Sequence, residues 1–261
     1  MPNFKQRYKL ARQSESQTVY AGTSDLFNIE NSLRTYSNDI VKKLAGGLGF
    51  RDNLNSRITL LDFGAGTGTL AEIWKSLYGV MPICVEIDRN QLEILRSKGF
   101  KAFSSMAELD GLVNYIYASN VLEHIEDDVK VLMEMKTKIL TGGKIAIYVP
   151  ALSILFSELD KRVGHYRRYS KKELVRKVKA AGFDVQDCYY NDCLGVLATF
   201  LLKVFGYKNK IGLGSNQSLR FYDRFIYPIS KLLDFILFRH LIGKNLILFA
   251  VNSNNLQELI E

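Results

Sequence analysis

The sequence is poor in cysteine and histidine, with three residues of each. Cys84, Cys188 and Cys193 cannot all pair, and none stands in a CxxC spacing. This excludes a disulfide scaffold and a cysteine-based metal or redox centre. We therefore expect reduced, partly buried thiols.

Long hydrophobic runs are also lacking. The apolar run Leu194–Phe205 has 12 residues, whereas crossing a bilayer takes roughly 20. Residues 1–17 are basic and polar without the apolar core of a signal peptide, so we expect a cytoplasmic protein. Repeats and low-complexity segments are not visible, and a composition of 47% hydrophobic and 24% charged residues is typical of a globular chain.

Acidic residues are too few to balance the basic ones, which leaves a net charge of +8. Such an excess suggests an anionic partner, which could be nucleic acid, a phosphorylated substrate or an acidic membrane face. Nine basic residues lie between Lys161 and Lys179 against one acid, Glu173, and those from Lys171 onward fit the solvated face of a helix. Because no stacking aromatic array or base-reading module is visible, we expect no nucleic acid partner.

Periodicity and punctuation divide the chain into blocks. Residues 1–56 are polar and are expected to form a helical cap, with helical spacing from Asp25 to Leu44. Residues 57–190 alternate short apolar runs with amphipathic helices, which predicts an α/β cofactor-binding core with a parallel sheet. Residues 191–245 are expected to form a helical, acceptor-side or membrane-proximal insertion, and residues 246–261 the last strand and a tail.

The expected strands are short apolar runs: Ile58–Phe63, Ile83–Ile87, Tyr115–Ala118, Lys144–Val149, Phe183–Tyr189 and Leu246–Val251. Three expected helices are followed by glycines that suit left-handed caps: Thr69–Leu77 before Gly79, Asn90–Lys98 before Gly99, and Asp127–Leu140 before Gly142-Gly143. A capping box at Ser170 predicts a helix that runs to Gly182.

The strongest signal is the glycine loop Asp62–Gly68, which reads DFGAGTG and follows the first strand. Glycines let the backbone approach a ligand closely and adopt positive φ. A dinucleotide fingerprint, GxGxxG, would need Gly or Ala at Thr69, so that pattern fails by one position. Asp62 would repel a pyrophosphate, but it suits a ligand with a sulfonium and an α-amino group, as in S-adenosylmethionine.

A second acid stands at the end of the next strand. Glu86 follows the loop by about 20 residues, the interval at which an acid accepts hydrogen bonds from ribose hydroxyls. Asp88 is the rival candidate, although its place at the start of a helix favours an N-cap. A glycine turn of purely structural use remains the alternative for the loop.

The loop and the strand-ending acid resemble those of class I S-adenosylmethionine-dependent methyltransferases. Ala118–Asp127, which reads ASNVLEHIED, is similar to the family segment that lines the cofactor and the acceptor. Val149–Ala151 and Leu159–Ser170, the latter reading LDKRVGHYRRYS, resemble a bacterial subgroup often associated with glycosyltransferases of cell-surface polysaccharide or lipid-linked sugar assembly. The helical tail that ends at 243–248 also fits that subgroup.

The resemblance implies a Rossmann-like α/β fold with a seven-stranded, mostly parallel sheet, helices on both faces and an antiparallel last strand. It implies S-adenosyl-L-methionine as the cofactor and S-adenosyl-L-homocysteine as the product. The implied cofactor residues are Asp62, Gly64, Ala65, Gly66, Thr67, Gly68, Glu86, Ile87, Ser105, Met106, Asn120 and Val121. Ser105 stands where relatives often carry an acid, so adenine recognition is expected to depend on backbone groups and Met106.

The resemblance also bears on metals. Some relatives bind a divalent ion through an ExxEH arrangement, whereas this chain reads Asn120-Val-Leu-Glu123-His124 and lacks one carboxylate. A hard cation prefers several oxygen ligands, and losing one weakens the site. We expect no metal.

Methyl transfer is an in-line displacement at an activated carbon, so the protein mainly aligns the nucleophile and excludes water. A hydroxyl acceptor, however, should lose its proton as it attacks, and histidine suits that task near neutral pH. His124 and His165 are therefore candidate bases, with bracing of a helix and ordering of a loop as the alternatives. His240 is expected to be structural.

The loop after the fifth strand is expected to bind the acceptor. Arg167 and Arg168 could grip a phosphate or carboxylate through bidentate bonds. Alternatively, one arginine pairs with Asp160 or Glu123 and holds the loop. The candidate acceptor-binding residues are Asp160, Tyr166, Arg167, Arg168 and Tyr169.

Together these observations predict a methyltransferase that acts on a hydroxyl of a small molecule, glycan or lipid-linked sugar, with nitrogen and carbon acceptors left open. The rivals are a catalytically silent S-adenosylmethionine-binding protein and an NAD-dependent oxidoreductase. Peripheral contact with the inner membrane face through 194–205 and 225–241 is the alternative to ordinary buried helices. The sequence does not indicate an oligomeric state.

Overall fold

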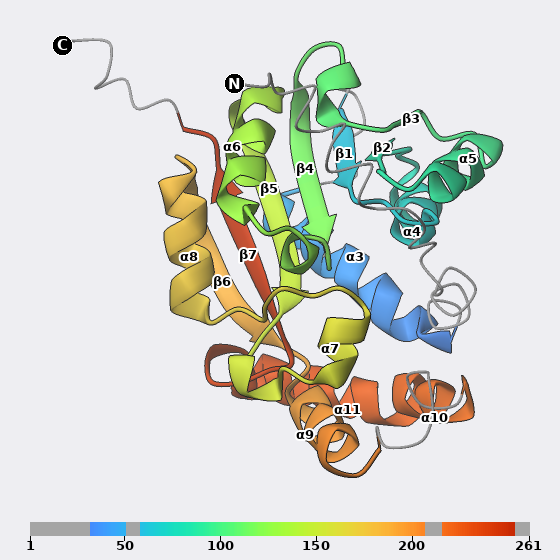
Figure 1. The fold of residues 1–261 in the computed structure, drawn as a ribbon, viewed down its shortest axis with the longest axis vertical. Helices are drawn as coiled ribbons and strands as arrows, with labels where there is room; N and C mark the ends of the chain where they lie inside the picture. The colour runs from blue at the N-terminus through green and yellow to red at the C-terminus, as the bar shows by residue number, and fades with distance from the viewer. Residues whose placement is uncertain (1–31, 51–57, 207–215, 254–261) are drawn as a thin grey trace, which may run out of the picture.

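The computed structural model describes residues 32–50, 58–206 and 216–253 (Figure 1). The predicted cap before residue 32, the segment 51–57 and the tail from residue 254 lie outside the described residues. The fold within the described part is built on one sheet with helices on both faces.

Seven strands form the sheet in the order β3-β2-β1-β4-β5-β7-β6. The strands are β1 (Leu60–Phe63), β2 (Ile83–Val85), β3 (Ala102–Phe103), β4 (Val113–Ser119), β5 (Ile139–Pro150), β6 (Asp184–Asn191) and β7 (Asn245–Val251). β7 is antiparallel to both of its neighbours, and the other pairs are parallel. This arrangement confirms the predicted fold.

Alternating side chains along the strands feed two large clusters of buried apolar residues, as period-2 strands require. On β7, Leu246 and Leu248 join one cluster, whereas Ile247 and Phe249 join the other. The first cluster is covered by α6 (Asp128–Lys138) and α8 (Lys171–Ala180). The second is covered by α3 (Arg34–Leu48) and α4 (Thr69–Tyr78). α3 therefore forms a layer of the core.

Two further helices begin beyond the carboxyl ends of strands. α5 (Arg89–Ser97) follows β2, and α7 (Glu158–Arg162) follows β5. A short 3-10 helix, η2 (Leu122–His124), follows β4. Because the carboxyl ends of parallel strands meet at one edge of a sheet, these connections bring their side chains to the same end of the molecule.

The insertion between β6 and β7 is helical, as predicted. It contains α9 (Cys193–Leu201), the π-helical turn η4 (Leu202–Gly206), α10 (Asn216–Phe221), a second π-helical turn η5 (Tyr222–Ile226), α11 (Tyr227–Ile236) and the 3-10 turn η6 (Phe238–His240). In Figure 1, α9, α10 and α11 lie together at one end of the molecule. No helix of the described part is long and apolar enough to cross a membrane.

One predicted helix end is wrong. α6 ends at Lys138, and Gly142 and Gly143 lie within β5 instead of capping the helix. The reason is pairing beyond the end of β7: the Gly142 N–H donates to the carbonyl of Asn252, and the Asn252 N–H donates to the carbonyl of Gly143. By contrast, the predicted N-cap is confirmed, because the Ser170 hydroxyl accepts the Glu173 N–H at the start of α8.

The cysteines behave as expected. Cys84, Cys188 and Cys193 are free thiols and all three are buried. Burial raises the pKa of the Cys188 thiol to about 12. A thiol so far from ionisation is a poor nucleophile, so the cysteines are packing residues.

Candidate active site

The glycine loop turns sharply between β1 and α4. Gly64, Gly66 and Gly68 all have positive φ, at 74°, 57° and 87°. A Cβ at Gly64 would overlap Val121, and a Cβ at Gly68 would lie 2.8 Å from Leu95 Cδ2. Packing within the protein therefore accounts for these two glycines.

Gly66 differs from the other two glycines of the loop. The nearest atom to a Cβ built there is Gln91 Oε1 at 3.5 Å, an ordinary contact distance. The described residues leave the space over Gly66 open, and a ligand could approach the backbone there as the glycine pattern predicts.

Both predicted cofactor acids are buried beside this loop. The Tyr117 hydroxyl donates to Asp62 Oδ2 at 2.6 Å. Glu86 accepts the N–H groups of Gly66 at 2.8 Å and Asp88 at 2.9 Å. Burial raises the pKa of Glu86, although these backbone hydrogen bonds oppose the rise. Glu86 thus ties the loop to the end of β2, and a carboxylate with about four lone-pair sites can still accept ribose hydroxyls.

The residues that follow Glu86 have separate roles. The Asp88 carboxylate accepts the N–H groups of Asn90 and Gln91, which confirms it as the N-cap of α5. Ile87 is 74% exposed at the tip of β2. An apolar side chain held in the open beside the loop offers a surface to a flat ring.

The remaining cofactor residues of the prediction lie around the same loop. Ala65 and Thr67 are buried within it. Met106 is also buried and packs into the core below the third strand, while Ser105 is half-buried ahead of it. The Met106 side chain therefore presents little surface to a ligand, which leaves backbone groups for adenine recognition.

Asn120 and Val121 follow β4 and meet the glycine loop. Asn120 has a φ of 54°, which is uncommon for a residue with a side chain, and its N–H donates to the carbonyl of Tyr148. Such strained positions cluster at functional sites. Val121 lies over Gly64, so the residues predicted beside the sulfonium are adjacent to the loop.

An acid-base cluster combines Glu123 and His124 of η2 with His165 from the loop after α7. Glu123 is fully buried, and within the described part of the chain neither of its carboxylate oxygens has a hydrogen-bond partner. Burial raises its pKa to about 8. His165 Nε2 lies 3.9 Å from Glu123 Oε1, and the rings of His124 and His165 are edge to face with centroids 4.5 Å apart. The structure thus brings both predicted histidines together.

The sequence does not identify Glu123 as part of an acid-base site. It indicates this residue only as a partner of a loop arginine or as a metal ligand. Its burial without a partner is a tertiary property, so the sequence carries only a weak signal, the adjacent Glu-His pair.

Asp160 orients one histidine of the cluster. His165 Nδ1 lies 2.9 Å from Asp160 Oδ1, and Arg168 Nε donates to the same oxygen at 2.8 Å. Burial of Asp160 opposes ionisation, but the hydrogen bonds from His165 and Arg168 outweigh it and lower the pKa to about 2. The alternative role predicted for one arginine is therefore observed, since Arg168 pairs with Asp160.

The two histidines differ as proton acceptors. Burial, followed by the proximity of His165, lowers the pKa of His124 to about 4. His124 is therefore neutral at physiological pH and holds a proton poorly. His165 has the Asp160 carboxylate on Nδ1, which fixes the orientation of its ring.

Most of the other residues of this loop already form hydrogen bonds within the protein. Arg167 donates to Asp128 Oδ2 at 2.9 Å and to the carbonyl of Glu126 at 2.7 Å. Tyr169 is fully buried, and its hydroxyl donates to Asp128. In this structure Tyr169 has no surface for an acceptor and supports the loop. Tyr166 remains exposed.

Three groups of the cluster could also surround an ion. Ligand atoms of Glu123, His124 and His165 all lie within 4.8 Å of one another. The segment that lacks a carboxylate ligand ends at His124, whereas His165 comes from a later loop. The absence of a metal therefore stays a prediction.

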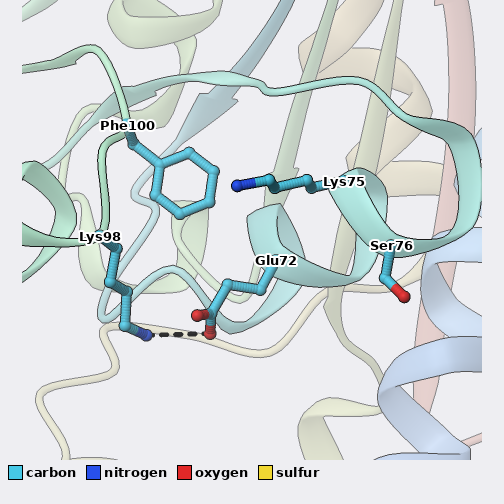
Figure 2. A pocket seen from close by; sticks show the side chains of 5 residues that line it. All are labelled: Glu72, Lys75, Ser76, Lys98 and Phe100. Carbon is cyan, nitrogen blue, oxygen red and sulfur yellow. Dashed lines mark hydrogen bonds and ion pairs between the residues drawn. The ribbon is translucent and has the colours of Figure 1, made fainter.

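A separate surface hollow of about 450 Å³ lies against α4. Figure 2 shows Lys98 and Glu72 pointing toward each other at its edge, joined at 2.9 Å. Its other lining residues are Lys75, Ser76 and Phe100. None of these belongs to the predicted site, and their charges are suited to solvent contact.

Comparison with solved structures identifies the same architecture elsewhere. A S-adenosylmethionine-dependent methyltransferase of Archaeoglobus fulgidus is 18% identical with a TM-score of 0.53, covering 87% of this chain and 99% of that one. Geranyl diphosphate C-methyltransferase of Streptomyces coelicolor is 13% identical with a TM-score of 0.55, covering 82% and 79%. The [4+2]-cyclase SpnF, 16% identical with a TM-score of 0.52, covers 83% and 81%. These likenesses show a shared fold, which also carries a cyclase.

Membership is decided by the sequence. No curated protein matches the chain significantly. The model of the methyltransferase domain family, however, matches residues 33–187, which contain the glycine loop, both cofactor acids and the histidine cluster. The fold is the Rossmann-like class I methyltransferase fold, and the chain belongs to the methyltransferase domain family.

Proposed function

We propose that the protein transfers the methyl group of S-adenosyl-L-methionine to a hydroxyl of a small molecule, glycan or lipid-linked sugar. Family membership supports the reaction class. The observation that carries the hydroxyl acceptor is His165, whose Nδ1 is held by Asp160 at 2.9 Å beside the buried Glu123.

The residues around the loop fit this cofactor. The open space over Gly66 admits the ligand, and Glu86 lies beside it for the ribose hydroxyls. Exposed Ile87 offers its side chain to the adenine, and Asn120 and Val121 border the loop at the sulfonium end. S-adenosyl-L-methionine, when bound, supplies a methyl carbon that is already activated by the sulfonium.

The chain then has to position a nucleophile and take its proton. His165 Nε2 would take the hydroxyl proton of the acceptor, whose oxygen would receive the methyl group that the bound cofactor supplies. Asp160 keeps the ring oriented and stabilises the cationic form. His124 remains neutral and packs edge to face against the ring of His165.

The pairing of the arginines favours a neutral acceptor group at the reacting centre. Arg167 and Arg168 are each ion-paired with a carboxylate of the protein, and each also donates to a backbone carbonyl. Gripping a phosphate would require one of these partly buried pairs to open. Tyr166, exposed at the rim of the loop, is the residue best placed to contact a sugar ring or another flat surface.

The test is a labelled-methyl assay on lipid and polysaccharide extracts, comparing the wild type with His165→Ala and His240→Ala. We expect His165→Ala to lower turnover by about 100-fold or more, the usual range for a general base. His240, exposed in η6, is the matched control. Affinity for S-adenosyl-L-homocysteine should be unchanged in both variants. Normal turnover of His165→Ala would reject the assigned base.

A further inference from the structure

The segment from α10 to α11 has its amphipathic pattern reversed. Four polar or hydroxyl-bearing residues at helical spacing face the protein and are buried: Asp223, Tyr227, Ser230 and Asp234. The opposite row is apolar and between 51% and 67% exposed: Phe221, Phe225, Ile229, Leu232 and Ile236. Surface helices normally bury the apolar row.

The buried polar row fixes this orientation. Asp223 accepts the backbone N–H groups of Thr35 and Tyr36 at 2.9 and 2.8 Å. Asp234 accepts the N–H groups of Asp192 at 2.6 Å and of Cys193 at 3.0 Å. Rotating the helix to bury its apolar row would strip both carboxylates of these partners, so the outward apolar row is a fixed feature of the fold.

α9 extends the exposed apolar surface. It packs beside α11, where the Leu194 N–H donates to the Ser230 hydroxyl at 3.0 Å. Its outer side chains include Leu197, Phe200 and Leu201, each at least 45% exposed. We call the exposed apolar side chains of α9 and of residues 216–236 the outer apolar face. Contiguous apolar surface of this kind marks an interaction site.

Within residues 193–241, the exposed charges that accompany the outer apolar face have one sign. Between residues 193 and 241 the sequence contains only two acids, Asp223 and Asp234, and both are buried. In the described part of this segment the exposed charged side chains are basic: Lys203, Arg220, Arg224 and Lys231. A second copy would bring the same basic rim against its own, whereas an anionic surface complements it.

We propose that the outer apolar face docks on the surface of an anionic lipid bilayer. Aromatic and aliphatic side chains beside arginine and lysine are the pattern of helices that lie in the plane of the membrane interface. The apolar side chains would enter the headgroup boundary while the rim cations meet the lipid phosphates. The described helices do not span the bilayer, so the contact is peripheral.

Docking would also orient the active site. The outer apolar face belongs to the end of the molecule toward which β4 points, and η2 with its acid-base cluster follows β4 (Figure 1). The cluster would therefore open toward the membrane-proximal side. This inference stands apart from the proposed reaction, because binding to lipid can be measured without an acceptor.

Vesicle flotation of the full chain tests the proposal, with phosphatidylglycerol-rich vesicles compared with pure phosphatidylcholine. We expect binding to the anionic vesicles that weakens as salt is raised. Ile229→Ser with Ile236→Ser should lower the partition coefficient by about tenfold or more, since both side chains leave the interface. Leu112→Ser with Met133→Ser removes equally exposed apolar side chains elsewhere and should have no effect.

A second pair of variants isolates the charge contribution. Arg220→Gln with Arg224→Gln should lower anionic binding roughly 25-fold, at about fivefold per cation. Lys172→Gln with Arg176→Gln removes two exposed cations at the same spacing on α8 and is the control. The proposal is overturned by failure to bind anionic vesicles, or by equal loss in test and control variants. Sedimentation that shows a dimer abolished by Ile229→Ser with Ile236→Ser would overturn it too, because a second copy would then cover the face.

Discussion

Glu123 is fully buried, and neither carboxylate oxygen has a hydrogen-bond partner among the described residues. Burial of an unpaired carboxylate is costly, and the group responds by holding its proton, with a pKa of about 8. A fold that needed only packing there would be served better by glutamine or leucine. The unpaired acid beside His165 is therefore best explained by chemistry, because perturbed groups of this kind concentrate at active sites.

This residue predicts a pH dependence of stability. The folded pKa of about 8 lies above the ordinary value of 4.5, so between these values the folded state binds the extra proton. Glu123 therefore lowers the free energy of unfolding as the pH rises through that window. Thermal unfolding should be measured at pH 5, 6.5 and 8. As the pH rises, the unfolding midpoint of Glu123→Gln should increase relative to that of the wild type by several degrees, at about 2–4 °C per kcal/mol.

The control for this measurement is Glu93→Gln, a substitution of the same type at an exposed site on α5. Its unfolding midpoint should follow that of the wild type at every pH. Parallel curves for Glu123→Gln and the wild type would show that Glu123 is ionised in the folded state.

Substitution of Gly66 by valine is predicted to weaken ligand binding while costing no more stability than the same substitution at another glycine with positive φ. Valine there would fill the open space over the loop, so affinity for S-adenosyl-L-homocysteine should fall by at least about 100-fold. Gly79→Val is the matched control, because Gly79 also has a positive φ and open space around its Cβ position, but caps the far end of α4. Both variants carry a backbone cost of roughly 1–2 kcal/mol. Calorimetry that finds equal affinities would remove the loop from the ligand site.

At the scale of elements, the sequence predicts those helices and strands that have a clear hydrophobic pattern or a clear capping residue. The apolar run of β7 and the N-cap signal of α8 give the element and its position directly. β3 has two residues, too few for a periodic signal. The start of β5 at Ile139 depends on pairing with Val113 and on a hydrogen bond from Asn252, which no local pattern contains.

For α11, the hydrophobic periodicity predicts the helix but not which of its faces is buried. The pattern is present, but the usual rule assigns its apolar row to the core, whereas Asp223 and Asp234 hold the polar row there instead. Membrane contact through 225–241 is one of the alternatives that the sequence leaves open. Which face of the helix points outward, however, is set only by the tertiary hydrogen bonds of Asp223 and Asp234.

Asp234 gives the prediction at this scale. Its carboxylate accepts the N–H groups at the start of α9, so Asp234→Ala would leave buried donors unpaired. Urea denaturation should show a loss of about 2–3 kcal/mol. Asp234→Asn, which keeps one acceptor oxygen, should lose about half as much, and exposed Asp110→Ala should change little. Equal stabilities of the alanine variants would mean that α9 does not depend on this cap.

For the whole molecule, the sequence identified the segments that form the site but could not derive their side-chain partners. Arg167 and Asp128 are 39 positions apart, and their ion pair exists because the α7–α8 connection folds back over α6. The same closure turns Arg168 toward Asp160. Both arginines therefore look like free anion ligands in the sequence and are paired in the structure.

Binding of the cofactor should stabilise the entire fold. S-adenosyl-L-homocysteine at about 100 times its Kd should add about 2.7 kcal/mol and raise the thermal midpoint by about 5–10 °C. NADH at the same concentration should leave it unchanged. Dialysis against EDTA should also have no effect, whereas a fall would indicate an ion among Glu123, His124 and His165. A shift with NADH as large as with S-adenosyl-L-homocysteine would contradict the cofactor assignment.

The position of β7 also affects how the chain matures during synthesis. This strand, Asn245–Val251, lies between β5 and β6 in the sheet although it comes last in the sequence. A nascent chain therefore cannot close this sheet until β7 has left the ribosome, and until then β5 and β6 have unpaired edges. Stop codons introduced before Asn245 should yield aggregating products in place of shortened enzymes.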